Sequence, residues 1–223
     1  MYYPFIRDAN QAKKRSMIVY GSSRVTLEPN IVNIQLGVIN EDTELTKAQQ
    51  KNASLIQQIT QALIDQGISK EHIQTADYSI YPQYDYVDNI QQFRGYQVTH
   101  LLSITIEDIS KTGSVIDTAV KNGANSVSNI HFSIKNKDIH YNTALKMALN
   151  NAIEKAKTIA SDLKVHLDSV PAKILEQLTD HSPPIPYKAL ANSNVIAGTS
   201  TSIEAGQLQL EAKVEAKFYY YTQ

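Results

Sequence analysis

The sequence predicts an α+β protein in which helices pack on a largely antiparallel sheet. Two kinds of segment carry this prediction. Several segments alternate apolar and polar residues, which is the period of a strand with one buried and one solvated face. Other segments repeat apolar residues every three or four positions, which is the period of an amphipathic helix. Strand and helix segments follow one another along most of the chain, so a mixed fold is expected rather than a bundle or a sandwich.

The longest predicted helix covers residues 138–163 and carries an apolar stripe that is mostly alanine. No glycine or proline interrupts this segment, and Asp138 is a candidate for capping its first turn. A stripe of such small side chains lets a helix lie close against a sheet. We therefore expect this alanine-rich helix to be the central element of the fold.

The remaining elements follow from the same two periods and from turn residues. Strands are predicted over residues 16–24, 31–39, 73–86, 95–107, 126–135, 169–178 and 206–221, and two further helices over 43–66 and 111–121. Residues 85–96 are interpreted as a long hairpin connection. The order β-α-β-β-α-β within residues 31–135 matches two split β-α-β units.

The domain organisation is expected to be simple. Residues 1–15 are polar and aperiodic and predict a flexible N-terminal arm. Residues 16–223 predict a single domain. Within it, residues at about 180–202 hold three prolines and many small polar residues, which indicates a long mobile loop.

Composition excludes several classes of function. Lys and Arg total 21 against 22 Asp and Glu, a net charge of −1, so no basic surplus exists to neutralise a phosphate backbone and we expect no nucleic-acid partner. The chain has 0 cysteines, which excludes disulfides, thiolate zinc sites and a cysteine nucleophile.

Location is predicted from the N-terminal residues and from hydropathy. Residues 1–21 contain neither a basic start followed by an apolar run nor any other feature of a secretory signal. No segment approaches the roughly 20 apolar residues of a transmembrane helix. The sequence as written therefore predicts a soluble cytoplasmic protein; an exported or envelope protein is the alternative if a leader was removed.

Motifs for catalysis or metal binding are not found. The chain lacks a phosphate-binding loop, a G-x-S-x-G elbow and any H-x-H or H-E-x-x-H spacing. His131, Asp138 and His140 come nearest to a cluster, but a strand face and a helix cap account for them. His100 falls on the apolar face of its strand and is interpreted as a hydrogen-bonded core histidine. We assign no catalytic, cofactor-binding or metal-binding residue, and we expect no cofactor.

Aromatic residues gather around the predicted hairpin, and they are the candidate interaction residues: Tyr78, Tyr81, Tyr84, Tyr86, Phe93 and Tyr96. Aromatic side chains on a hairpin can stack on nucleic-acid bases. They are also enriched in contacts between subunits. Because the chain is nearly neutral, we favour a subunit contact.

Taken together, short features spread over residues 18–220 resemble the SIMPL-domain family, a bacterial group that includes periplasmic immunogenic and oxidative-stress-linked proteins. The features are Gly21, Pro29-Asn30, the LGV at 36–38, Gly67-Ile68, the segment Thr75 to Pro82, Gly95-Tyr96, Gly123-Ala124, Ala144-Leu145 and a final strand after Gly206. The chain departs from the family at Ser23, Asn30 and Lys164-Val165. The resemblance implies an α+β fold, self-association, a link to stress or envelope physiology, and no established catalytic residue.

Two functions are therefore weighed. The first is a non-enzymatic protein that acts through homo-oligomeric assembly or through binding an unidentified macromolecule. The alternative is a small-molecule binder or weak enzyme with a pocket under the 180–202 loop.

Overall fold

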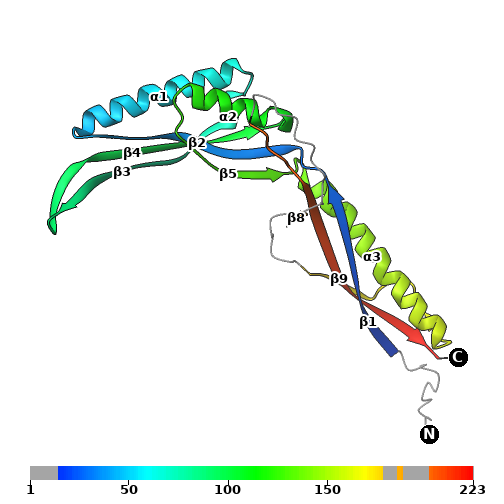
Figure 1. The fold of residues 1–223 in the computed structure, drawn as a ribbon. Coiled ribbons are helices and arrows are strands. Elements are labelled where there is room, and N and C mark those ends of the chain that lie inside the picture. Colours follow the sequence, from blue (N-terminus) through cyan, green and yellow to red (C-terminus); the bar gives the residue numbers. More distant parts are fainter. Residues whose placement is uncertain (1–14, 178–184, 188–200, 223) are drawn as a thin grey trace, which may run out of the picture. The chain divides into compact units, whose positions relative to one another are not determined.

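The computed structural model describes residues 15–177, 185–187 and 201–222, and Figure 1 shows the course of the chain. The chain divides into two compact units. One, the split-sheet unit, is built on residues 28–135; the other, the long-helix unit, brings together residues from the two ends of the chain and from 136–187. The expected single domain over residues 16–223 stays a prediction. The expected N-terminal arm lies outside the described residues except for Arg15, which begins a strand.

The split-sheet unit contains one four-stranded antiparallel sheet in the order β3-β4-β2-β5. Its elements are β2 (Ile31–Asp42), α1 (Leu45–Asp65), β3 (Ile73–Val87), β4 (Ile90–Ile106), α2 (Thr112–Lys121) and β5 (Ser126–Ser133), with short 3₁₀ turns at Lys70–His72 and Ile109–Lys111. Strand β4 lies between β2 and β3, and β2 lies between β4 and β5. The two predicted split β-α-β units are thereby confirmed, and the order is that of a ferredoxin-like fold.

The core of this unit lies between the sheet and its two helices. Every second residue of β2 is buried, because the side chains of a strand alternate between the two faces of the sheet: Val32, Ile34, Leu36 and Val38. They pack with alternate residues of β4 and with Ile59, Leu63 and Val115 from the helices. The apolar face of β2 that the alternating pattern predicted is therefore the face that packs against the helices.

One polar side chain, Asn52 of α1, lies within this core with 1% of its surface exposed. Its Nδ2 donates to Asn40 Oδ1 at 2.8 Å and to the Val38 carbonyl oxygen at 3.2 Å. Asn40 Nδ2 in turn donates to the carbonyl oxygen of Ala48 in α1, at 2.9 Å. These bonds tie α1 to β2, because a buried donor without a partner is costly. The Asn52 Oδ1 atom itself has no hydrogen-bond partner among the described residues.

The predicted connection over residues 85–96 is wrong in extent. Strands β3 and β4 continue their pairing to Val87 and Ile90, and only Asp88 and Asn89 remain as the turn. Both turn residues have positive φ, 52° and 61°. Such a two-residue turn suits the twist of a hairpin, and asparagine and aspartate tolerate this conformation better than most residues.

The long-helix unit consists of a sheet centred on β9 (Gln207–Tyr221) and of α3 (Lys137–Asp162). Strand β1 (Arg15–Leu27) pairs antiparallel with β9 along its whole length. The short strands β6 (His166–Leu167), β7 (Lys173–Glu176) and β8 (Ile185–Tyr187) also pair with β9. The strand predicted over residues 169–178 is confirmed in part as the shorter β7; its predicted start is wrong, because the chain turns through residues 168–172 between β6 and β7.

Helix α3 confirms the predicted alanine-rich helix. Its buried residues are all alanines spaced four apart: Ala144, Ala148, Ala152, Ala156 and Ala160. The predicted cap is wrong, because the residue at the N-cap is Asn136, in the left-handed conformation with φ 59°, and Asp138 lies within the first turn. There the carboxylate of Asp138 still interacts favourably with the helix dipole.

The contact between α3 and β1 is unusually close at Gly21. A Cβ atom added to Gly21 would overlap the carbonyl oxygen of Ala148 and lie 2.8 Å from Ala152 Cβ. Next to this contact, Ser23 Oγ donates to the Ala144 carbonyl oxygen at 2.6 Å. Glycine on the strand and alanine on the helix together allow the two backbones to approach.

We expect Gly21→Ala to lower the free energy of unfolding by about 1–3 kcal/mol, because the new methyl group must push α3 away from β1. The measurement is urea unfolding followed by circular dichroism. Ser22→Ala is the matched control, since the Ser22 side chain is exposed and only its backbone is bonded to α3. Equal stability of the two variants would contradict the close packing.

We expect Asn52→Ala to destabilise the protein by about 1–3 kcal/mol, because it removes the donor that serves Asn40 and the Val38 carbonyl oxygen. Gln57→Ala, on the exposed face of the same helix, should change the stability by less than about 0.5 kcal/mol. Similar losses in both variants would contradict the role assigned to the buried amide, because alanine is the better helix former at both positions.

Candidate interaction surface

The β3–β4 hairpin extends beyond the rest of the sheet. Strand β2 pairs with β4 only from Val32–Ile106 to Asp42–Tyr96. Residues 90–95 of β4 therefore pair with β3 alone. Figure 1 shows the hairpin continuing past the point where α1 begins. Among the residues that the structure describes, neither a third strand nor a helix of this unit covers the end of the hairpin, and its side chains are exposed on both faces.

Aromatic side chains occupy one face of this extension. Tyr84 lies opposite Phe93 in the strand register, and their ring centroids are 5.9 Å apart. The ring of Phe93 also meets the ring of Tyr96 edge to face, with centroids 5.1 Å apart. Tyr86 follows Tyr84 on the same face and is the most exposed of these residues, at 73%. We call Tyr84, Tyr86, Phe93 and Tyr96 the aromatic face.

A β-bulge builds this face. Gly95 pairs with Gln83 but Phe93 pairs with Tyr84, so Arg94 is an extra residue in β4. In a regular strand, residues 93 and 96 would point to opposite faces; the extra residue places Phe93 and Tyr96 on the same face. Gly95 is buried, and a Cβ atom there would lie 2.7 Å from the Asp42 carbonyl oxygen.

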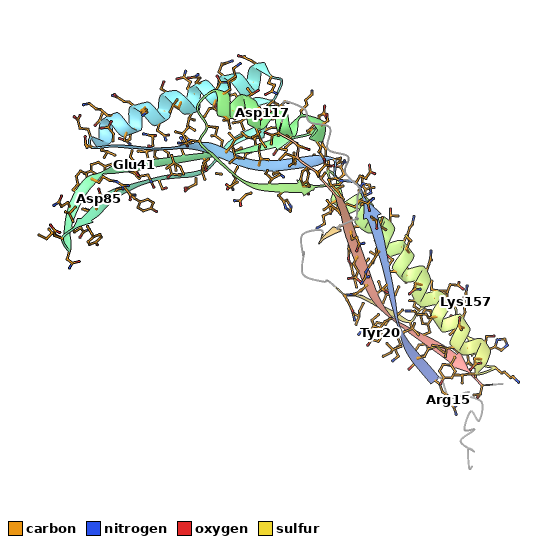
Figure 2. All side chains as sticks on the ribbon, viewed as in Figure 1. Arg15, Tyr20, Glu41, Asp85, Asp117 and Lys157 are labelled. Atoms are coloured by element: carbon orange, nitrogen blue, oxygen red, sulfur yellow. The ribbon has the colours of Figure 1, made fainter. Side chains whose placement is uncertain are left out.

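The opposite face of the hairpin is held by charged and polar groups. Arg94 Nη2 lies 2.9 Å from Glu41 Oε1, and Arg94 Nη1 lies 3.2 Å from Asp85 Oδ1. Gln97 Nε2 donates to the same oxygen of Glu41 at 3.0 Å. Figure 2 labels Glu41 on β2 and Asp85 on the hairpin. These exposed ion pairs join the hairpin to the end of β2 but contribute little stability individually.

The six predicted interaction residues therefore do not form one surface. Tyr81 lies opposite Gln97, on the face away from the helices, with 60% of its surface exposed. Tyr78 lies on the helix-covered face, nearer to α1, where Gln49 Nε2 donates to its hydroxyl oxygen at 3.4 Å. The remaining four make up the aromatic face.

Two apolar residues at the tip of the hairpin were missed. Val87 and Ile90 face each other in the register and are 48% and 64% exposed. They were missed because residues 85–96 were interpreted as a connection. The signal that could have found them is Asp88-Asn89 flanked by two β-branched residues, a pattern typical of a two-residue hairpin turn.

His100 lies beside Tyr78, on the face of the sheet that packs against α1. The two rings meet edge to face with centroids 5.1 Å apart, and His100 Nε2 lies 3.2 Å from Thr75 Oγ1. Burial lowers the pKa of His100 from its ordinary value of 6.5, and the nearby charge of Asp77 partly opposes this shift. The histidine is hydrogen-bonded as predicted, but it is half-buried and does not belong to the core.

The predicted metal and pocket candidates receive no support. His131 lies on β5 in one unit, whereas Asp138 and His140 lie on α3 in the other. Within the described ranges no three His, Asp or Glu residues are grouped so as to hold a metal ion. Most of the 180–202 loop lies outside those ranges, so a pocket beneath it stays a prediction. Thr201 lies near the C-terminal end of this loop, and its Oγ1 donates to Oδ1 of Asp117 in α2 at 2.6 Å.

The fold and this surface define a class: an α+β protein of two compact units that presents an exposed aromatic hairpin. The chain belongs to the SIMPL family, which is described as a protein of unknown function (DUF541) and whose profile matches residues 17–218. This match confirms the resemblance found in the sequence. No helix among the described residues is both long and apolar enough to cross a bilayer.

Relatives from several bacteria are similar along most of the chain. The uncharacterized protein YggE of Escherichia coli K12 is 23% identical over 204 residues, which are 91% of this chain and 82% of the relative. The 26 kDa periplasmic immunogenic protein of Brucella melitensis is 27% identical over 173 residues, which are 75% of this chain and 68% of the relative. A Brucella abortus protein of the same name is also 27% identical.

These relatives overturn one expectation. The predicted cytoplasmic location is wrong, because the Brucella relatives are named as periplasmic proteins, which points to export. The prediction was based on the lack of a leader pattern in residues 1–21. That lack says nothing about whether a longer precursor carries one.

We expect His100 to make stability depend on pH in the acidic range. Because its pKa in the folded protein lies below 6.5, the unfolded chain binds the proton more readily. The contribution of neutral His100 is thus complete above pH 6.5 and is lost as the pH falls below that value. Urea unfolding at several pH values should show a shallower decline for His100→Gln than for the unaltered protein; parallel declines would contradict the assignment.

Proposed function

We propose that this protein acts without catalysis, by assembling with further copies of itself through the aromatic face. Support comes from one observation: large apolar and aromatic side chains are exposed together on a hairpin that extends beyond its sheet. Tyr84, Tyr86 and Phe93 are 45%, 73% and 49% exposed. Exposed apolar groups gathered in this way are typical of interaction sites rather than of free protein surface.

The chemistry of the aromatic face fits a protein contact. Tyrosine and phenylalanine bury much apolar area with few rotatable bonds, and they are enriched at interfaces. The ion pairs of Arg94 with Glu41 and Asp85 lie on the other face of the hairpin. A second copy of the chain offers the same aromatic face, which makes a symmetric contact possible.

We further propose that the protein is exported and works in the cell envelope. The names of the Brucella relatives support this location. The link to stress physiology is an expectation of the family resemblance and is proposed on that ground alone.

The test is the mass in solution, measured by size-exclusion chromatography with light scattering. We expect the unaltered chain to run as a discrete multimer. The triple variant Tyr84→Ser, Tyr86→Ser, Phe93→Ser should dissociate at concentrations at least about tenfold higher, since central aromatic residues contribute 2 kcal/mol or more in typical interfaces. Tyr81→Ser, an equally exposed tyrosine on the opposite face, is the matched control and should leave the mass unchanged.

Two results would contradict the proposal. One is a monomer at every concentration for the unaltered chain. The other is an unchanged mass for the triple variant with an unchanged circular dichroism spectrum, which would place the assembly contact elsewhere.

A further inference from the structure

Strand β1 has one edge that no described strand covers. It pairs with β9 on one side only. On the other side, the Tyr20 carbonyl oxygen accepts a hydrogen bond from Lys155 Nζ at 2.7 Å. The Ser22 backbone N–H donates to Asn151 Oδ1 at 3.2 Å. Side chains of α3 therefore reach the outer edge of β1, so the helix overhangs this edge.

The backbone groups nearer the start of β1 have no strand partner at this edge. Because the backbone groups of a strand alternate between its two edges, those of Ser16 and Ile18 point to the same side as those of Tyr20. Among the described strands, none pairs with them there. An unpaired edge of this kind is where a further strand adds to a sheet.

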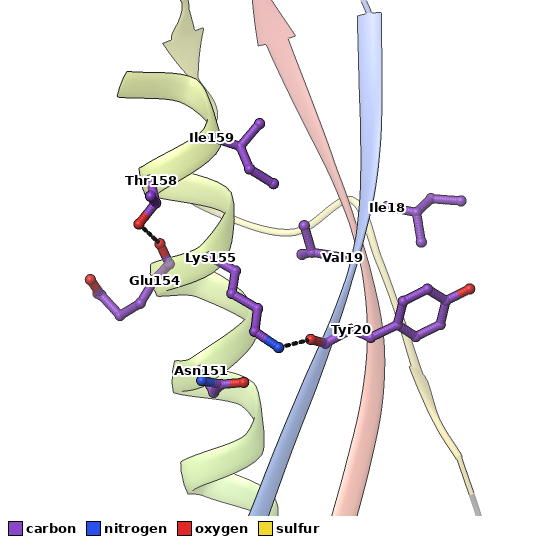
Figure 3. A pocket seen from close by; sticks show the side chains of 8 residues that line it. All are labelled: Ile18, Val19, Tyr20, Asn151, Glu154, Lys155, Thr158 and Ile159. Carbon is purple, nitrogen blue, oxygen red and sulfur yellow. Dashed lines mark hydrogen bonds between the residues drawn. The ribbon is translucent and has the colours of Figure 1, made fainter. Parts of the chain in front are cut away.

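A groove lies beside this edge, between β1 and α3, with a volume of about 520 Å³. Residues 18–20 of β1 form one wall of the groove, and residues 151–159 of α3 contribute the other. Figure 3 shows Ile159 pointing toward β1, whereas Ile18 and Tyr20 point away from α3. At these two positions the strand therefore presents its backbone to the groove.

The groove contains one positive charge that no described carboxylate neutralises. Lys155 Nζ has three N–H donors, and its described partner is the neutral carbonyl oxygen of Tyr20. Glu154 also lines the groove, but Figure 3 shows its side chain pointing away from β1, and its Oε1 lies 2.9 Å from Lys157 Nζ. The groove therefore favours a ligand with an anionic group at Lys155.

Apolar surface extends from Lys155 in one direction along the helix. Ile159 and Leu163 follow Lys155 at intervals of four residues, so the three side chains lie on one face of α3. Ile159 and Leu163 are 40% and 56% exposed. From Lys155 to Leu163 the helix rises about 12 Å, a length that three or four residues of an extended chain cover. The groove thus matches a short extended ligand with a carboxylate at one end.

We propose that the groove binds the C-terminal end of another polypeptide, which adds to β1 as a strand and places its terminal carboxylate at Lys155. The peptide runs parallel to β1, because its chain then lies beside Ser16 and Ile18 while its last residue reaches Lys155. Lys155 keeps its bond to the Tyr20 carbonyl oxygen and gives its other N–H donors to the carboxylate. This site is separate from the aromatic face and does not depend on the proposed assembly.

A fatty acid is the competing occupant, because it also carries a carboxylate and an apolar chain. It has no backbone N–H or C=O groups to pair with those of Ser16 and Ile18. A peptide satisfies the open edge, the positive charge and the apolar surface together. The test therefore needs one readout for the carboxylate and a second readout for the pairing of backbone groups.

The first experiment measures fluorescence anisotropy of a pentapeptide, Ser-Thr-Val-Ile-Val, that carries fluorescein at its amino terminus and a free carboxylate. Its β-branched residues suit an added strand. We expect saturable binding to the unaltered chain. The same peptide with a C-terminal amide should bind at least about tenfold more weakly, because it lacks the charged partner of Lys155. No saturable binding of the free acid, or equal binding of both peptides, would overturn the proposal.

Variants of Lys155 test its assigned role. We expect Lys155→Met to weaken binding of the free acid at least about tenfold and to leave binding of the amide unchanged. Lys155→Arg keeps the charge and should keep the preference for the free acid. Lys146→Met is the matched control, since Lys146 is an exposed lysine of α3 outside the groove. Equal binding by Lys155→Met and Lys146→Met, with unchanged circular dichroism spectra, would overturn the assignment.

The second experiment tests the pairing with β1. A strand directs its N–H groups to a given neighbour only at every second residue. N-methylation at one of the two adjacent Val-Ile residues should therefore weaken binding at least about tenfold, and N-methylation at the other residue should change it much less. Equal effects at both residues, together with displacement of the peptide by decanoate, would assign the groove to a fatty acid and overturn the proposal.

Discussion

The antiparallel pairing of β2 with β4 is the constraint on which the candidate surface depends. It buries alternate residues of both strands beneath α1 and α2, and Asn52 ties α1 to the end of β2 through Asn40 and Val38. Its last pair is Asp42 with Tyr96. Beyond that pair, β3 and β4 pair only with each other among the described strands. Their length past this point turns an ordinary hairpin into an exposed one, and the bulge at Arg94 places Phe93 and Tyr96 on the same face.

The long-helix unit is packed differently, with small residues at the contact between α3 and β1. A helix that carries only alanine on its buried face gains little from each side chain, so close approach to the sheet is needed to exclude water and gain contacts. Gly21 permits that approach. The same closeness brings Asn151 and Lys155 within hydrogen-bonding reach of the edge of β1. The close packing of α3 on β1 therefore also lets Asn151 and Lys155 bond to the backbone at the edge of β1. These two bonds reach Tyr20 and Ser22.

Much of the fold was predictable because it rests on local periods. The alternation of β2, β4 and β9 and the alanine spacing of α3 each identify an element and its buried face. The ends of elements were less predictable. The cap at Asn136 depends on a left-handed backbone, which asparagine tolerates but does not require. The strand predicted over residues 169–178 is shorter in the structure, where β7 covers only Lys173–Glu176. The aromatic residues of the candidate surface were found, and the alternation of β3 already separates Tyr81 from Tyr84 and Tyr86. The placement of Phe93 and Tyr96 on one face was not predictable, because it depends on the one-residue bulge at Arg94.

The central claim is that the aromatic face is covered in the assembled protein. Hydroxyl-radical footprinting with mass spectrometry over a range of protein concentrations tests it most directly, because the hairpin carries its own reference in Tyr81 on the opposite face. We expect oxidation of Tyr84, Tyr86 and Phe93 to fall as the protein concentration rises, while oxidation of Tyr81 stays constant. Oxidation of all four residues that is constant with concentration, or that falls equally, would contradict it.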